Sequence, residues 1–170
     1  MSILSDDSFE GRGPGSAGME KAVTWVESYL KDAGIAPYFE HGYRDSLSTG
    51  NIVTYNVVGI IPAAEQTDRY VMLSAHLDHL GTVTGEPGSD HIFNGANDNA
   101  SGVAAVLSIA STLKSLRLQY NLLVVLFSAE ESGLLGSQHM AQWMKQKDLG
   151  LEYVINLEML GASYAPAPGK

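Results

Sequence analysis

Three short apolar stretches without polar alternation constrain the fold of this chain most. They cover residues 70–75, 122–127 and 153–157. A strand that is apolar at every position, and not at every second one, is typical of a parallel sheet that is covered on both faces. Helical patterns separate these stretches, and buried strands that alternate with helices are typical of an α/β fold. The sequence therefore predicts a parallel or mostly parallel sheet within an α/β domain.

The remaining elements are predicted from periodicity and composition. Apolar residues at helical spacing predict helices over residues 17–33, 99–116 and 133–145, and Gly34 ends the first of them. Residues 51–61 are rich in Val, Ile and Tyr and predict a further strand, and residues 38–40 suggest a short edge strand. Residues 81–97 form a long loop, and loops of this length are often functional.

Composition bounds the class of protein. The chain has 170 residues, 45% of them hydrophobic and 17% charged, which suits a single domain over residues 1–170. The net charge of −9 argues against nucleic acid or an anionic membrane as a partner. The sequence contains no cysteine, so disulfides and thiolate metal sites are excluded. We find no apolar stretch near the ~20 residues that span a membrane, and no signal peptide.

Potential metal ligands follow all three apolar strands. They are His76, the pair Glu130 and Glu131, and Glu158. Ligands of open α/β sheets bind at the carboxyl ends of the strands, so these side chains are expected at one edge of the sheet. Asp98 lies among small residues, Asn and Gly just before a helical pattern, and it can join them there.

These residue types suit zinc chemistry. Zinc binds neutral imidazole and carboxylate oxygens. A two-metal site needs a carboxylate that can bridge ions about 3.5–4 Å apart, and the short side chain of Asp98 can do so. Water acidified by the metals becomes a nucleophile near neutral pH, and a carboxylate that is not a ligand must take its proton. Adjacent Glu130 and Glu131 can divide the roles of base and ligand. Asp78 is a candidate to orient His76.

Four ordered motifs resemble those of a known family. They are SAHLDH at residues 74–79, NDNASG at 97–102, FSAEESGLLGS at 127–137 and NLEMLG at 156–161. The chain resembles the co-catalytic di-zinc exopeptidases, a family that includes secreted bacterial leucyl aminopeptidases, glutamate carboxypeptidase II, the transferrin receptor and glutaminyl cyclases. The resemblance implies a three-layer fold, in which helices cover both faces of a mostly parallel or mixed sheet.

The resemblance also implies residue roles. His76 and Glu158 would bind one Zn²⁺, Asp98 would bridge to a second, and Glu131 would bind that second ion. Glu130 would be the general base that returns a proton to the leaving amine.

Further implications concern the residues beside the ligands. Asp78 would orient His76, and the peptide bond between Asp98 and Asn99 would be cis. His79 has no ligand role in the family, so we interpret it as structural.

The chain departs from the family pattern at two points. Glu158 stands where the family usually has aspartate, which moves the donor by one methylene. The family's second zinc takes another histidine from a later segment, and no histidine follows His139 here. We therefore expect a catalytic domain that is incomplete at its C-terminus. A sheet interrupted in this way leaves an unpaired edge that favours self-association.

The sequence favours hydrolysis of N-terminal peptide bonds in a peptide substrate. A glutaminyl cyclase-like acyltransferase, a carboxypeptidase of the same family and a non-catalytic scaffold remain alternatives. A serine hydrolase is excluded because no Gly-x-Ser-x-Gly motif is present. The metal could be zinc, cobalt or manganese. Since the family's members are usually exported, a periplasmic or secreted protein is expected.

Overall fold

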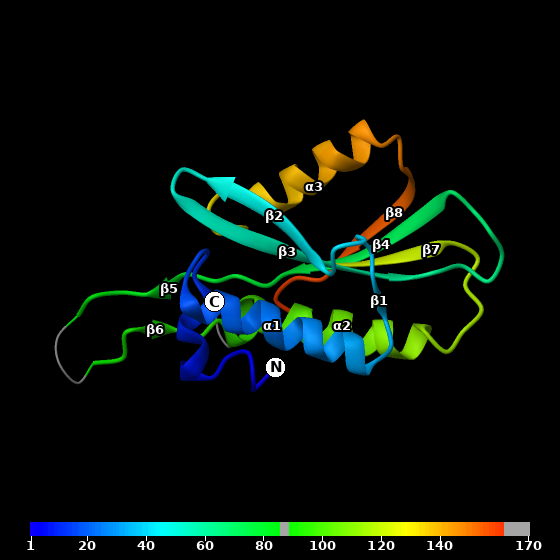
Figure 1. Cartoon of the computed structure of the whole chain (residues 1–170). Helices are drawn as coiled ribbons and strands as arrows, with labels where there is room; N and C mark the ends of the chain where they lie inside the picture. Colours follow the sequence, from blue (N-terminus) through cyan, green and yellow to red (C-terminus); the bar gives the residue numbers. More distant parts are fainter. Residues whose placement is uncertain (86–88, 162–170) are drawn as a thin grey trace, which may run out of the picture.

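The computed structural model describes residues 1–85 and 89–161, and it shows a sheet between two helical layers (Figure 1). Helices α1 (Ala17–Asp32) and α2 (Gly102–Leu113) cover one face, and α3 (Leu135–Gln146) covers the other. The predicted α/β class with helices on both faces is confirmed. The predicted irregular tail, residues 162–170, lies outside the described residues. None of the described helices has the length and apolarity that crossing a bilayer requires.

The sheet is mixed, with the strand order β1-β3-β7-β4-β8. Strands β4 (Arg69–His76), β7 (Asn121–Phe127) and β8 (Gly150–Asn156) form its parallel half. Strand β3 (Ile52–Ile61) pairs antiparallel with β7, and both β1 (Ala36–Pro37) and β2 (Arg44–Thr49) pair antiparallel with β3. The parallel half is the part that the apolar stretches predicted.

Two predictions about strands were wrong. Residues 153–157 were expected to be covered on both faces, but β8 is an edge strand whose Tyr153, Val154 and Ile155 are 66%, 54% and 52% exposed. The short strand expected at residues 38–40 lies instead at β1, and β2 was not predicted. Strand β2 alternates buried and exposed residues, as a half-covered antiparallel strand does, but its sequence is too polar to show an apolar pattern.

The region expected to be a long loop contains a short hairpin. Strands β5 (Gly81–Thr82) and β6 (Ile92–Phe93) pair antiparallel beside η1 (Asp7–Arg12), a 3-10 helix near the N-terminus. The predicted start of α2 is also displaced, because a π-helical turn, η2 (Ala96–Ser101), precedes the helix.

The two faces of the sheet differ in how much apolar surface they bury. The α1 and α2 face holds a large core that includes Val23, Val26, Val103 and Leu107. The α3 face holds a smaller cluster, in which Met140 packs with Met72 and Leu123. Each fully buried aliphatic side chain contributes about 1.5–3 kcal/mol. The buried strands β4 and β7 thus form a rigid platform for the side chains that follow them.

Candidate metal centre

The register of the parallel strands brings their carboxyl ends together. His76, the last residue of β4, lies opposite Phe127 of β7, and Ser74 lies opposite Asn156 of β8. A hydrogen bond from Ser74 Oγ to Asn156 Oδ1 (2.9 Å) joins β4 to β8 near this edge. The predicted convergence of strand ends at one edge of the sheet is therefore what the structure shows.

The first donor group consists of His76, Asp98 and Glu158. His76 Nε2 lies 3.0 Å from Asp98 Oδ1 and 3.0 Å from Glu158 Oε1. The imidazole is almost fully buried, while the two carboxylates are 36% and 43% exposed. Three donors on three separate segments thus face one point at the surface of the sheet.

The second donor group shares Asp98 and adds His79 and Glu131. His79 Nδ1 lies 2.8 Å from Glu131 Oε1 and 3.9 Å from Asp98 Oδ2. Within each group, one donor atom from every residue lies within 4.8 Å of the others. The two oxygens of Asp98 therefore face different donor groups, which is the arrangement that a bridging carboxylate needs.

The donor sets fit zinc. Zinc bonds to nitrogen and oxygen are about 2.0–2.2 Å long, so the corners of a tetrahedral site are about 3.3 Å apart. The nitrogen–oxygen separations of 3.0 Å in the first group, and of 2.8 and 3.9 Å in the second, scatter around that value. The converging carboxylates would repel one another without a cation between them.

The side chain of Asn99, the residue after Asp98, binds the chain on both sides of Glu158. The Asp98–Asn99 peptide bond is cis, as the family resemblance implied. Buried Asn99 donates from Nδ2 to the carbonyl of Leu157 (3.0 Å), and its Oδ1 accepts from the backbone N–H groups of Gly102 (3.0 Å) and Met159 (3.2 Å). These bonds hold the residues on either side of Glu158 against the Asp98 loop.

Two neighbouring polar residues reinforce this link. Asn97 Oδ1 accepts from the N–H of Gly161 (2.7 Å), and Ser101 Oγ accepts from the N–H of Leu160 (3.0 Å). The small polar residues of the Asp98 motif therefore bind the segment that carries Glu158 to the Asp98 loop.

Asp78 contacts His76 differently from the prediction. His76 Nδ1 bonds to the backbone carbonyl of Asp78 at 3.0 Å, whereas the nearer carboxylate oxygen lies 3.8 Å away. The buried carboxylate instead accepts from the backbone N–H groups of Glu130 (3.1 Å) and Glu131 (3.3 Å). Asp78 thus fixes the turn that presents the two glutamates, because its short side chain reaches that turn and not the ring.

Electrostatics distinguish His76 and Glu130. Burial lowers the pKa of His76, but the carboxylates of Asp78, Glu158 and Glu130 outweigh burial and raise it to about 9. Burial raises the pKa of Glu130, and nearby carboxylates add to this effect while His76 opposes it. Glu130 is therefore a stronger base than an exposed glutamate.

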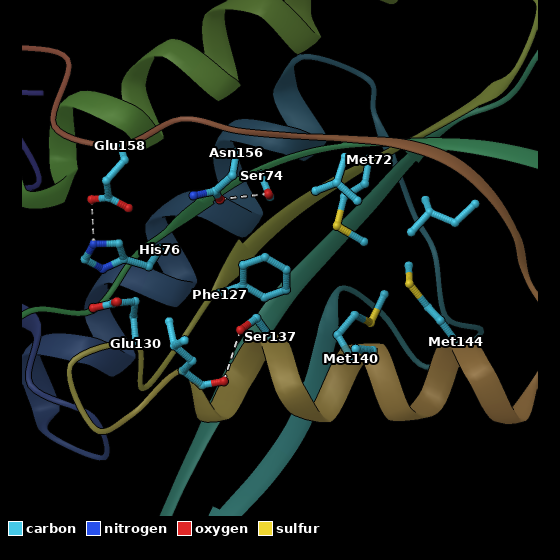
Figure 2. A pocket seen from close by; sticks show the side chains of 14 residues that line it. Met72, Ser74, His76, Phe127, Glu130, Ser137, Met140, Met144, Asn156 and Glu158 are labelled. Carbon is cyan, nitrogen blue, oxygen red and sulfur yellow. Dashed lines mark hydrogen bonds and ion pairs between the residues drawn. The ribbon is translucent and has the colours of Figure 1, made fainter.

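A cavity of about 420 Å³ opens beside the first donor group (Figure 2). His76, Glu130 and Glu158 line one end of it, and Figure 2 shows these three side chains close together. Met72, Met140 and Met144 line the other, apolar end, and Phe127 lies between the two ends. The predicted base therefore faces open space next to the first donor group.

The sequence did not predict the position of His79. This residue was interpreted as structural, but the structure places it among the donors of the second group. Its position three residues after a strand-end histidine was the available signal. His139 lies elsewhere and contacts Asp45 Oδ1 at 3.0 Å.

The fold and the two donor groups define an α/β domain of the zinc exopeptidase class. Peptidase family M28 matches residues 56–167, and the chain belongs to this family. Zn²⁺ is the cofactor that the family and the names of its members support.

Individual relatives agree with this assignment. Aminopeptidase YwaD of Bacillus subtilis is 35% identical over 69% of this chain and 24% of its own length. A probable zinc metalloprotease of Pyrenophora teres is 36% identical over 68% of this chain and 24% of its own length. The chain thus spans about a quarter of the length of these curated relatives.

Solved structures share the fold. Glutaminyl cyclase of Porphyromonas gingivalis is 25% identical with a TM-score of 0.76, over 95% of this chain and 59% of that one. LapB of Legionella pneumophila has a TM-score of 0.72 at 23% identity, over 98% of this chain and 43% of that one.

Proposed function

We propose that the protein hydrolyses N-terminal peptide bonds as a zinc-dependent aminopeptidase. The observation that carries this proposal is the shared carboxylate of Asp98 between two donor groups, with Glu130 free beside them. Within the described part of the chain, the Glu130 carboxylate accepts no hydrogen bond. Membership of peptidase family M28 and the similarity to aminopeptidase YwaD support a peptide substrate.

The site residues would have separate roles. His76, Asp98 and Glu158 would hold one zinc ion. Asp98 and Glu131 would hold the other, and His79, whose Nδ1 lies 2.8 Å from Glu131 Oε1, offers a nitrogen donor there. When bound, zinc would polarise the scissile carbonyl and acidify a water molecule. Glu130 takes the proton of the attacking water and then gives it to the leaving amine.

Asp78 keeps the backbone of both glutamates in place through its two accepted hydrogen bonds. The side chains of Glu130, the base, and Glu131, the ligand, therefore continue to point in different directions during the reaction.

Release of the first residue from peptides tests this proposal. The whole protein, loaded with zinc, is expected to release the N-terminal residue of an unblocked peptide and to leave an N-acetylated peptide intact. Release of C-terminal residues from the blocked peptide would instead identify a carboxypeptidase. Absence of any cleavage by zinc-loaded protein would favour a non-catalytic scaffold.

A glutaminyl cyclase-like reaction is the second candidate. The similarity to the Porphyromonas gingivalis enzyme, over 95% of this chain, favours it. A peptide with N-terminal glutamine separates the two reactions. A cyclase yields ammonia and a pyroglutamyl peptide, whereas an aminopeptidase yields free glutamine and a shortened peptide.

We further propose that the edge of β8 mediates self-association. The support is a strand with large apolar side chains exposed, and with no partner strand on one edge among residues 1–85 and 89–161. Light scattering of this chain is expected to give a mass above 18.2 kDa, which falls to that value when Ile155 is replaced by lysine. A monomer before the substitution would contradict this proposal.

We also propose that the protein acts outside the cytoplasm. The support is the resemblance of its four motifs to those of secreted aminopeptidases. Fractionation of the source cells is expected to recover it with exported proteins, and recovery with cytosolic markers would contradict the proposal.

A further inference from the structure

Arg12 is a fully buried cation that the proposed mechanism does not use. Its side chain is 0% exposed. Burying a guanidinium is unfavourable unless its donors are satisfied. Arg12 donates from Nε to the carbonyl of Leu77 (2.8 Å), from Nη1 to that of Asn94 (2.7 Å) and from Nη2 to that of Gly95 (2.9 Å). A further bond from Nη1 reaches the carbonyl of Leu4.

The positions of these carbonyls connect Arg12 to the metal centre. Leu77 lies between His76 and Asp78, directly after β4. Asn94 and Gly95 lead into the turn that carries Asp98. One guanidinium therefore ties the end of β4 to the loop of the shared carboxylate, and ties both to the N-terminal segment.

Gly95 and Asn94, which lie beside this guanidinium, also help to hold the loop. Gly95 has a φ of 59°, and a Cβ there would lie 2.6 Å from Arg12 Nη2 and would also meet the carbonyl oxygen of Asp98. Asn94 adds a second link, because its Nδ2 donates to Ser5 O (2.8 Å) and Asp7 Oδ1 (2.7 Å). The loop is therefore bound to the N-terminal segment through the Asn94 side chain and through the backbone carbonyls of Asn94 and Gly95.

The charge of Arg12 faces the carboxylates of the centre without pairing directly with one. Among the described residues, no carboxylate lies within 4.0 Å of the guanidinium, so its bonds all go to the backbone. Burial lowers the pKa of Arg12 to about 10, and Asp78 and Asp98 oppose that change. Arg12 thus stays charged at neutral pH and offsets part of the repulsion among the clustered carboxylates.

We propose that Arg12 is a positioning residue of the metal centre, which holds the loop of Asp98 at a fixed distance from the end of β4. It acts through the loop and touches no reacting atom. The inference rests on the proposed function, because it takes Asp98 to be the carboxylate shared by two zinc ions. Residues that support metal ligands typically change metal affinity by about 10–100-fold when they are replaced.

Zinc affinity of Arg12 variants tests the inference. The variants are Arg12→Met, which removes the charge and the donors, and Arg12→Lys, which keeps the charge with fewer directed donors. Arg44→Met is the control, because Arg44 also forms hydrogen bonds and ion pairs, partly exposed ones to Glu20 and Glu27 of α1, outside the metal centre. Zinc binding is measured by competition with a chromophoric chelator, and thermal unfolding of the metal-free proteins reports their stability.

Arg12→Met is expected to weaken zinc binding by at least tenfold, and Arg12→Lys by less. Arg44→Met is expected to lower stability while its zinc affinity stays within about twofold of wild type. A folded Arg12→Met or Arg12→Lys protein with wild-type zinc affinity would overturn the inference.

If neither Arg12 variant folds, Asn94→Ala decides, because it removes the parallel link between the loop and the N-terminal segment. A folded Asn94→Ala protein is expected to bind zinc several-fold more weakly, and unchanged affinity would contradict the inference. If the wild-type protein binds no zinc, the proposed function fails together with the inference. If the wild type binds zinc and the variants bind it equally well, only the inference fails.

Discussion

The two donor groups share Asp98 but are held in different ways. The first takes His76 from the end of β4 and Glu158 from the segment that follows the exposed edge strand β8. The second takes His79 and Glu131 from turns that Asp78 and Arg12 hold through the backbone. Asp98 therefore joins one donor group that is positioned by the sheet to another that is positioned by loops. Both groups need the loop of Asp98 to be held in place.

The largest expected effect separates the two neighbouring glutamates. Glu130→Gln is expected to lower kcat by about 10²–10⁴, because the amide cannot accept the proton, and to leave zinc content unchanged. Glu131→Gln is expected to reduce the zinc content. Steady-state kinetics and elemental analysis of the whole protein measure both outcomes. Lost zinc in Glu130→Gln would show that the division of roles is wrong.

The pH dependence of the metal-free chain sharpens the description of the first group. The folded pKa of His76 is about 9, above the 6.5 of an unfolded histidine. Its stabilising contribution is thus fully present below pH 6.5 and is lost as pH rises to about 9. The difference corresponds to about 3 kcal/mol. The raised pKa of Glu130 also makes stability fall as pH rises, but in a lower window that begins near 4.5.

Urea unfolding of the metal-free chain between pH 6 and pH 9.5 measures this loss. The variant His76→Gln is the control, since it cannot titrate, and its stability should fall much less over the same range. A wild-type stability that rises between pH 6.5 and 9 would contradict the raised pKa of His76 in the first group.

A smaller effect tests whether His79 belongs to the second group. His79→Ala is expected to weaken binding of one zinc ion by about 10–100-fold and to leave the other unchanged, because only the second group loses a donor. His139→Ala is the matched control, since His139 contacts Asp45 outside the centre. Isothermal titration with zinc distinguishes the two ions. If His79→Ala binds two zinc ions with wild-type affinity, His79 is a structural residue and not a ligand.

The smallest effect concerns the edge that carries Glu158. Ile155→Lys is expected to change the free energy of unfolding by no more than about 0.5 kcal/mol, because Ile155 is largely exposed. Leu123→Ala, in the fully buried β7, should cost about 2–5 kcal/mol. Chemical unfolding of the two variants at low protein concentration makes the comparison. A large loss in Ile155→Lys would show that the edge of β8 is covered.

Much of the fold was predictable because buried parallel strands have a distinct pattern. Strands β4 and β7 each contain a run of apolar residues without polar alternation, and their ends identified His76 and the two glutamates. An unpaired sheet edge was expected, but its position at β8 could not be read from the strand itself, since an apolar strand has the same sequence whether or not its neighbour is present. The polar strand β2 carries no apolar periodicity that could have revealed it.

The site was predictable where the chemistry follows the strands. The convergence of His76, Asp98 and Glu158 followed from strand ends and one motif. The position of His79 did not, because the direction of a side chain in a loop depends on contacts from distant segments. The roles of Asp78 and Arg12 were hidden for the same reason: their partners are backbone groups, which every residue has.

Zinc content shows most directly whether Asp98 joins two metal-binding groups. The wild-type protein and Asp98→Ala are dialysed against zinc-free buffer and analysed for zinc per chain, with circular dichroism to confirm that both are folded. Zinc bound to the wild type is expected to be lost from both positions in the single variant. Unchanged zinc content in folded Asp98→Ala would contradict the shared role of this carboxylate.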